Sequence, residues 1–254
     1  MKRIGLIVPS SNTTMETELP QLLRSHPLVG DQITFHSSRA RLHTVDVESL
    51  RCMVNDGERC AAEVGDAGVD VVAYACLVAL MSLGAAAHRS VEERLGGVIS
   101  ANIAKDLPIV SSAGALVRTL KALGLKKVAV VAPYMPQLTQ MVIEYIEADG
   151  FTVVDSVSLA VSNNLEVGRL DPMKLPEHVS KLDLSQADGL ILSACVQMPS
   201  LPAVQMVQDM IGMPVISAAT CTTREILEAL GLDPVVPNAG AALGTMPGQI
   251  VVPT

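Results

Sequence analysis

Two cysteines of the chain each end an apolar run that has the length of a β-strand. Cys76 ends the run GVDVVAYAC at residues 68–76, and Cys195 ends the run ADGLILSAC at residues 187–195. In α/β proteins, ligands bind at the carboxyl ends of strands. Because a thiolate is a strong nucleophile and a thiol is a usable acid near neutral pH, the two positions indicate a catalytic cleft flanked by two thiols.

Two thiols on opposite sides of a small molecule allow two kinds of reaction. Two bases that remove and deliver a proton at one carbon cause racemisation. Alternatively, one thiolate adds to an electron-poor C=C bond while the second thiol donates or accepts a proton. The two cysteines alone do not distinguish between these reactions.

The segments around both cysteines carry no cationic side chain. Residues 73–80, AYACLVAL, and residues 193–200, SACVQMPS, contain no Lys, Arg or His. Backbone N–H groups after each strand must therefore lower the pKa of a reactive thiol, and the same groups would bind a carboxylate. Neutral side chains in loops offer further hydrogen-bond donors to carboxylate oxygens, namely Asn12, Tyr134 and Asn164.

Each of these loop residues also has a structural explanation. Asn12 would cap the helix that is expected to follow it, and Tyr134 would be an ordinary turn residue. Asn163 is as well placed as Asn164, because the two are adjacent. The other three cysteines are interpreted as packing residues: Cys52, Cys60 and Cys221.

The elements that position these residues alternate along the chain. Strands are expected at residues 3–8, 32–38, 69–75, 107–111, 127–132, 153–159, 188–193 and 214–217. Helical spacing fills most of the intervals, as at residues 46–67, whereas the apolar residues 77–87 after the first cysteine are expected to form a lid over the cleft. The alternation predicts an α/β fold with mainly parallel sheets.

The two halves of the chain resemble one another in order and in sequence. RIGLIVP at residues 3–9 matches KVAVVAP at residues 127–133, and the two cysteine runs match one another 119 residues apart. LPIVSSAGALVRTL at residues 107–120 matches MPVISAATCTTREI at residues 213–226. The repeat predicts two similar parallel-sheet α/β domains related by a pseudo-twofold axis, with the active site in the interdomain cleft.

The expected domain boundaries follow this repeat. The N-terminal domain comprises residues 1–111 together with 219–254 and carries Cys76. The second domain comprises residues 112–218 and carries Cys195. The two cysteines are then symmetry mates that point into one cleft. The Gly- and Pro-rich tail at residues 244–254 matches no motif.

The composition argues against several functional classes. The 254 residues are 49% hydrophobic and 2% aromatic, without Trp, so the core is expected to be aliphatic. A net charge of −8 without basic runs argues against nucleic acid or a membrane surface as a partner.

No sequence-local spacing of His and Cys predicts a metal site. The chain opens on a strand instead of a signal peptide, no apolar run reaches membrane-spanning length, and the cysteine usage favours the cytoplasm.

Several motifs together resemble the Asp/Glu racemase superfamily and, within it, the maleate cis-trans isomerase family. Two strand-end cysteines are typical of the whole superfamily. SSNTTME at residues 10–16 and ACVQMPS at residues 194–200 are more specific to maleate isomerases. AYACLVA at residues 73–79, APY at 132–134 and SNN at 162–164 complete a resemblance that spreads over most of the chain.

The resemblance implies cofactor-independent conversion of maleate, a small dicarboxylate, to fumarate. It implies that Cys76 attacks the double bond to give a covalent succinyl-cysteine-type intermediate, with Cys195 as proton donor and acceptor. It also implies a homodimer. The positions that match carboxylate-binding residues of the family are Asn12, Tyr134 and Asn164, with the backbone amides of Leu77 and Val78.

Two other functions are compatible with these residues. A two-cysteine racemase of an amino acid or a hydantoin would need a polar or acidic partner for the substrate nitrogen, and the motifs offer none. A non-catalytic carboxylate-binding protein could keep the same fold, and it predicts that Cys76→Ser leaves function intact. Arylmalonate decarboxylase also resembles the chain, but it lacks a cysteine at the first position.

Overall fold

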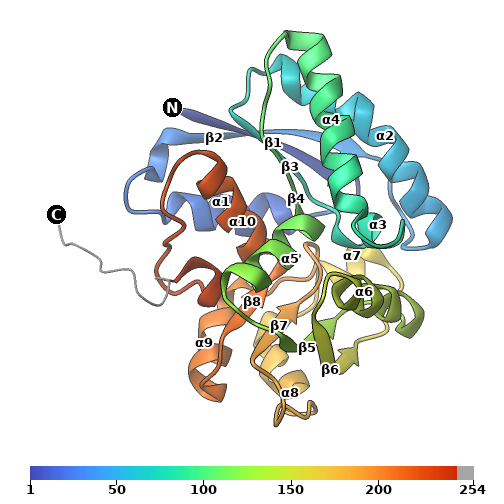
Figure 1. The fold of residues 1–254 in the computed structure, drawn as a ribbon, viewed down its shortest axis with the longest axis vertical. Coiled ribbons are helices and arrows are strands. Elements are labelled where there is room, and N and C mark those ends of the chain that lie inside the picture. The colour runs from blue at the N-terminus through green and yellow to red at the C-terminus, as the bar shows by residue number, and fades with distance from the viewer. Residues whose placement is uncertain (245–254) are drawn as a thin grey trace.

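Two four-stranded parallel sheets form the framework of the protein (Figure 1). The computed structural model describes residues 1–244, so the C-terminal tail from residue 245 lies outside the described residues. The strands are β1 (Lys2–Pro9), β2 (Ile33–Ala40), β3 (Val71–Tyr74), β4 (Ile109–Ser111), β5 (Lys127–Ala132), β6 (Thr152–Ser158), β7 (Gly189–Ser193) and β8 (Val215–Ser217).

The two sheets have the same strand order, which confirms the predicted fold class and repeat. The first sheet runs β2-β1-β3-β4 and the second runs β6-β5-β7-β8. Every pairing is parallel, from β1 with β2 and β3 to β7 with β8. The strands that precede the two cysteines, β3 and β7, therefore hold the same place in their sheets.

Helices connect the strands and cover the sheets. They are α1 (Met15–Arg24), α2 (Val47–Asp66), α3 (Leu77–Met81), α4 (Ala87–Ile103), α5 (Ser112–Ala122), α6 (Pro136–Ala148), α7 (Asn164–Val167), α8 (Leu175–Val179), α9 (Leu201–Ile211) and α10 (Ala218–Ala229). Short 3-10 helices lie at Gly30–Gln32, Pro172–Lys174 and Ala241–Leu243. Side-chain caps explain several of the starts: Asp46 accepts from the Ser49 N–H, and Ser111 accepts from the Gly114 N–H.

The segment after Cys76 differs from the lid that the sequence predicts. Residues Leu77–Met81 form α3, and all five are buried. This helix packs against α2, α4, α5 and α6. A short helix that is buried on every side has no polar face, so its sequence lacks the amphipathic spacing by which helices are predicted.

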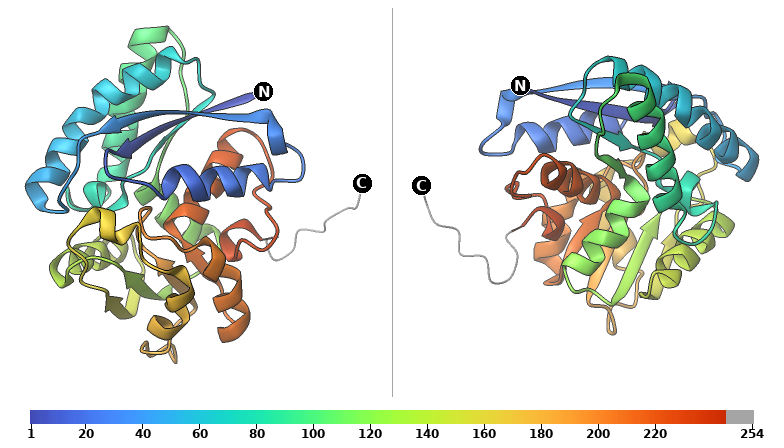
Figure 2. Two further views of the ribbon diagram at one scale, coloured as in Figure 1. Left: turned by 180° about the vertical axis from the view of Figure 1, so that it is seen from behind. Right: turned by 45° about the horizontal axis from the view of Figure 1, so that its top comes forward.

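The last α-helix of the described residues, α10, returns to the first half of the molecule. α10 contacts β3, β4 and α1, and both α1 and α10 lie on the side of the first sheet that faces the second sheet (Figures 1 and 2). α10 also contacts α5 and β8, which belong to the other predicted domain. The division into residues 1–111 with 219–254 and residues 112–218 therefore stays a prediction. The part of that division from residue 245 onward is outside the described residues.

The core is aliphatic, as the composition predicts. Fully buried side chains include Ile4, Leu6 and Leu80, with Tyr74 as the one aromatic ring among the largest of them in the described chain. Within residues 1–244, no helix combines the length and the apolar character that crossing a membrane requires.

Candidate active site

One small cavity brings together every site residue that the sequence predicts. Its volume is about 20 Å³, which is the space of about one water molecule. Its lining residues come from both halves of the chain: Pro9, Asn12, Leu42, Val45, Cys76, Leu77, Val78, Tyr134, Asn164, Cys195, Val196 and Gln197. Both thiols therefore face one space, as the pseudo-twofold repeat predicts.

Cys76 lies between the end of β3 and the first turn of α3, where it is the N-cap residue. Its side chain is buried, and this burial raises the pKa of the Cys76 thiol to about 12. The backbone N–H of Ala79 lowers the pKa of the Cys76 thiol, whereas the nearby Cys195 sulfur raises it. Leu77 and Val78 are the first two residues of α3, so their N–H groups have no acceptor within the helix and can bind an anion.

Cys195 lies in the loop between β7 and α9. The Gln197 N–H donates to its Sγ atom over 3.3 Å. Burial raises the pKa of the Cys195 thiol, and hydrogen bonds from the Tyr134 hydroxyl and from backbone N–H groups lower it. The Ser193 hydroxyl donates to the Cys195 carbonyl over 2.8 Å, which fixes the backbone at this turn.

Tyr134 follows β5 and is buried beside Cys195. Its hydroxyl donates to the Ala194 carbonyl over 3.1 Å. Because a hydroxyl has one proton, it can accept from the Cys195 thiol while it donates to Ala194, or turn and donate to a Cys195 thiolate. Tyr134 is therefore placed to respond to the protonation state of Cys195.

Asn12 follows β1 and is fully buried. Its Oδ1 accepts from the Thr14 and Met15 N–H groups over 3.1 and 2.9 Å, so it binds the first N–H of α1 from two positions ahead of the N-cap residue, which is Thr14. Its Nδ2 donates to the Val196 carbonyl over 3.3 Å. An amide NH2 group has two hydrogens, so a second one is available to a ligand, and the capping and ligand-binding roles are compatible.

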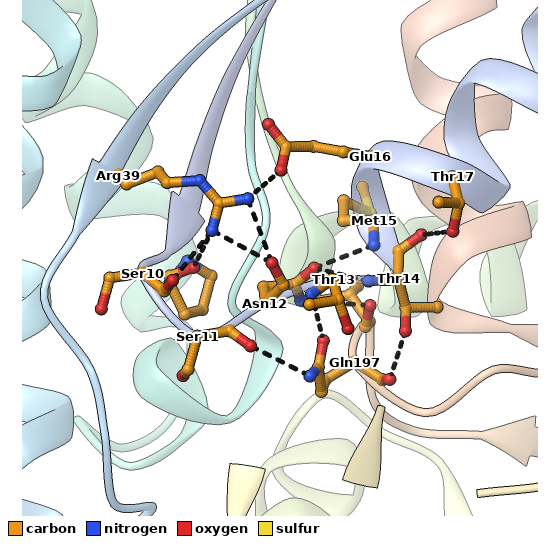
Figure 3. Close-up of polar contacts among 12 residues, drawn as sticks. Ser10, Ser11, Asn12, Thr13, Thr14, Met15, Glu16, Thr17, Arg39 and Gln197 are labelled. Atoms are coloured by element: carbon orange, nitrogen blue, oxygen red, sulfur yellow. Dashed lines mark hydrogen bonds and ion pairs between the residues drawn. The ribbon is translucent and has the colours of Figure 1, made fainter. Parts of the chain in front are cut away.

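The loop that carries Asn12 is also held from its outer side. The Arg39 guanidinium donates to the Asn12 carbonyl over 3.1 Å and to the Ser10 carbonyl over 2.9 Å, and it forms an ion pair with Glu16 (Figure 3). Fixing the backbone in this way limits the positions that the Asn12 side chain can take.

The two adjacent asparagines that the sequence could not separate have different surroundings. Asn164 is buried, lines the cavity, and donates from Nδ2 to the Ser11 hydroxyl over 2.8 Å. Asn163 lies outside the cavity lining, and its side chain caps α7 by accepting from the Leu165 and Glu166 N–H groups. The geometry thus favours Asn164 as the ligand-binding residue.

Sequence reasoning missed several residues of the site. Leu42 and Val45 reach the cavity from the loop after β2, and no local pattern marks them. Gln197 lies in the ACVQMPS motif, which was the available signal, but its contacts are with residues far away in the sequence. Glu18 lies outside the cavity lining and is buried next to the start of α9, where its Oε1 accepts from the Ser200 and Leu201 N–H groups.

The remaining cysteines lie outside the cavity lining. Cys60 and Cys221 are buried, in agreement with a packing role. The prediction for Cys52 was wrong, because this residue is exposed on α2. Among the described residues, no group of three or more His, Cys, Asp or Glu side chains could hold a metal ion.

The lining limits the chemistry of the site. None of its described side chains is a Lys, Arg, Asp or Glu. A substrate carboxylate would therefore be bound by amide, hydroxyl and backbone N–H donors, and a substrate ammonium group would find no acidic partner. Two buried thiols in such a cavity fit addition to a C=C bond of a dicarboxylate better than racemisation of an amino acid.

Comparisons with known proteins agree with this geometry. A sequence model of the arylmalonate decarboxylase family matches residues 4–243. The maleate isomerase of Geobacillus stearothermophilus is 54% identical over 243 residues, which cover 95% of this chain and 96% of that protein. The maleate isomerase of Alcaligenes faecalis is 52% identical and covers 97% of this chain and 98% of its own.

Solved structures give the same result. The maleate isomerase Iso from Pseudomonas putida S16 is 49% identical, with a TM-score of 0.93 over 96% of this chain and 98% of that chain. A cysteine-to-serine mutant of the Nocardia farcinica maleate cis-trans isomerase carries a covalently bound succinylcysteine intermediate; it is 46% identical, with a TM-score of 0.91 over 95% of this chain and 98% of its own. By sequence, by fold and by the paired cysteines of its cavity, the chain belongs to the maleate isomerase family of the Asp/Glu racemase superfamily.

Proposed function

We propose that this protein isomerises maleate to fumarate through a covalent adduct on Cys76, with Cys195 as the proton donor and acceptor. The observation that carries the proposal is the pair of buried thiols, from equivalent strand ends, that line one cavity with neutral hydrogen-bond donors. The family of the chain and the succinylcysteine intermediate of the Nocardia farcinica relative support it.

The reaction begins with addition. The Cys76 thiolate forms a C–S bond to one alkene carbon, and the π electrons move to the neighbouring carbon, next to its carboxylate. The Cys195 thiol gives its proton to that carbon, which leaves a Cys195 thiolate and a succinyl thioether on Cys76. The bond between the two central carbons is then single.

Rotation about that single bond moves the two carboxylates from the cis to the trans arrangement. After rotation, the Cys195 thiolate removes a proton from the carbon, the C=C bond re-forms, and Cys76 leaves as a thiolate. Fumarate is released and both cysteines return to their starting states. The cycle needs one proton shared by the two thiols, and the mutual repulsion of the sulfurs favours a pair with a single negative charge.

The carboxylates are bound by Asn12, Tyr134 and Asn164 together with the Leu77 and Val78 amides. Neutral donors hold a dicarboxylate less tightly than an arginine would. They also leave more of the available binding energy for the transition state, where negative charge moves onto the carbon next to a carboxylate.

Three finer features belong to the proposal. The isomerisation requires no cofactor, because thiol addition and proton transfer account for every bond that changes. The protein works in the cytoplasm, where its thiols stay reduced. It forms a homodimer, as the family resemblance implies, and light scattering of the purified protein tests this.

Proton NMR of maleate mixed with the reduced, cofactor-free protein tests the activity. The fumarate signal should grow while the maleate signal falls, and Cys76→Ser should abolish the conversion. Cys52→Ser is the matched control, because Cys52 is exposed and is not part of the cavity lining, and it should keep wild-type turnover. Absence of fumarate with the folded wild-type protein would refute the proposal.

A further inference from the structure

The side chain of Gln197 joins three segments of the chain at the edge of the cavity. Its Oε1 accepts from the Thr13 N–H over 2.9 Å, and its Nε2 donates to the Ser11 carbonyl over 3.2 Å and to the Asn164 carbonyl over 2.8 Å. The residue is buried. Both hydrogens and the oxygen of the carboxamide are thus used between protein segments, which leaves the side chain no spare donor for a ligand.

The backbone of Gln197 extends the same set of contacts. Its N–H donates to Cys195 Sγ over 3.3 Å, and its carbonyl accepts from the Thr14 hydroxyl over 2.7 Å. Figure 3 shows Gln197 below the loop that carries Asn12, with Arg39 on the opposite side of that loop. One residue therefore contacts the sulfur of Cys195 and the backbone on both sides of Asn12.

The contacts converge on the two asparagines. Ser11 and Thr13, which flank Asn12, are both bonded to the carboxamide of Gln197. Asn164 is bonded to it through its carbonyl, and the Asn164 side chain donates to the Ser11 hydroxyl. The position of each asparagine relative to Cys195 thus depends on one carboxamide.

The space beside this carboxamide is also restricted. A Cβ atom at Gly168 would lie 2.5 Å from Gln197 Nε2 and 2.7 Å from Thr13 Oγ1. Gly168 has a φ of −69°, which any residue can adopt, so close approach is the reason for glycine at this position. Gly168→Ala therefore perturbs the carboxamide without changing it chemically.

The hydrogen bonds of the Gln197 side chain occur in one of the two related halves of the chain. The repeat that aligns Cys76 with Cys195 aligns Val78 with Gln197. Valine cannot form the three hydrogen bonds that Gln197 makes, so this set of contacts holds the loop of Cys195, and Val78 provides no equivalent beside Cys76 within residues 1–244. The two related halves thus differ at the residue two positions after each cysteine.

We propose that Gln197 is a positioning residue, which sets the two carboxylate-binding asparagines, Asn12 and Asn164, at a fixed distance from Cys195. The inference rests on the proposed function, in which these asparagines bind the carboxylates of maleate and Cys195 transfers the proton. Gln197 itself touches no reacting atom with its side chain. Gln197 affects the reaction because it determines where Asn12 and Asn164 lie.

Steady-state kinetics of Gln197→Glu and Gln197→Met test this proposal. Both variants keep the backbone contacts, but Met loses all three side-chain bonds and an ionised Glu repels two carbonyl oxygens. KM for maleate should rise about ten-fold or more in both, with a smaller change in kcat. A protonated Glu regains one donor, so kcat/KM of Gln197→Glu relative to wild type should increase as the pH falls from about 8 to about 6. The same ratio for Gln197→Met should stay constant.

Two controls separate positioning from general stability. Gln186→Glu makes the same substitution at an exposed residue, and it should keep the wild-type KM. Gly168→Ala should raise KM in the same direction as the Gln197 variants, and it remains informative if those variants fold poorly. Circular dichroism melting curves identify any variant that is unfolded at the assay temperature.

The outcomes distinguish this inference from the proposed function. If wild-type protein makes no fumarate from maleate, the proposed function fails. If wild type is active, but folded Gln197→Met and Gly168→Ala both keep the wild-type KM, the positioning role is refuted. A lower kcat with an unchanged KM in these variants would also refute the positioning role, because misplaced binding groups must weaken substrate binding.

Discussion

The carboxylate of Glu18 accepts a hydrogen bond of 2.7 Å from the Leu201 N–H, across the boundary between the two halves of the chain. The same oxygen accepts from the Ser200 N–H over 2.6 Å. A buried acid on α1 thus caps the start of α9, at the far end of the loop that carries Cys195.

Glu18→Gln tests the charge of this cap and keeps its two backbone hydrogen bonds, because both N–H groups bond to Oε1, which glutamine retains. The Ser200 hydroxyl, which donates to Oε2 over 3.4 Å, loses that acceptor. Burial raises the pKa of Glu18 above its ordinary value of 4.5. The folded protein therefore binds this proton more tightly than the unfolded chain does, and the wild type loses stability as the pH rises from about 4.5 through the raised pKa. The variant has no such proton, so its Tm should increase relative to the Tm of the wild type as the pH rises through this range.

Differential scanning calorimetry at several pH values measures this difference. The exposed Glu93→Gln on α4 is the control, and its Tm should follow the wild type at every pH. A Tm difference between Glu18→Gln and wild type that stays constant with pH would show that the folded state does not perturb Glu18.

The pH dependence of turnover follows from the burial of both thiols. Burial raises the pKa of Cys76 to about 12 and that of Cys195 above its ordinary value of 9.0. Below these values the fraction of singly ionised pairs grows about ten-fold for each pH unit. We therefore expect kcat/KM for maleate to rise between about pH 6 and pH 9. A profile that is flat over this range would contradict the raised pKa values.

Tyr134→Phe removes the hydroxyl that contacts Ala194 and Cys195. The bond from Tyr134 lowers the pKa of Cys195, so its loss should raise that pKa and move the alkaline limb of the kcat profile to higher pH. The buried Ala194 carbonyl also loses its donor, which should cost about 1–3 kcal/mol of unfolding free energy. Urea unfolding and pH-dependent kinetics measure the two effects. An alkaline limb that moves to lower pH would exclude this role of the hydroxyl.

The adjacent asparagines offer a matched pair of variants. Asn164→Ala removes a cavity-lining amide and should raise KM for maleate about ten-fold or more. Asn163→Ala removes the cap of α7 and should cost about 1 kcal/mol of stability, with a much smaller effect on KM. Initial-rate kinetics and urea unfolding of both variants compare them directly. The reverse pattern would assign the ligand to Asn163.

The sequence predicted the architecture because periodic signals and the internal repeat agree. The eight segments predicted as strands each contain an observed strand or overlap one. RIGLIVP and KVAVVAP correspond to β1 and β5, which hold equivalent places in their sheets. α3 was missed for the opposite reason. It is short and buried on all sides, so tertiary packing determines it more than local pattern does.

The candidate site was predictable where strand ends position its residues. Cys76, Cys195, Asn12 and Tyr134 each follow a strand, and the parallel sheets bring them to one cavity. Gln197 was not predictable, because its role depends on contacts with Ser11, 186 positions away in the sequence. The choice between neighbouring asparagines likewise depended on the direction of each side chain, which α7 determines.

Mass spectrometry of Cys195→Ser incubated with maleate tests the central claim most directly. A neutral serine hydroxyl is a much weaker acid than a thiol and also a weak base. After Cys76 adds to the double bond, a water molecule supplies the proton to the neighbouring carbon, and the serine hydroxyl cannot remove it again efficiently, so the thioether should accumulate. Peptide mapping should then find an adduct of the mass of maleic acid on the peptide that contains Cys76. A folded variant that carries this adduct on another residue, or that carries none after prolonged incubation, would contradict the account of Cys76 as the nucleophile.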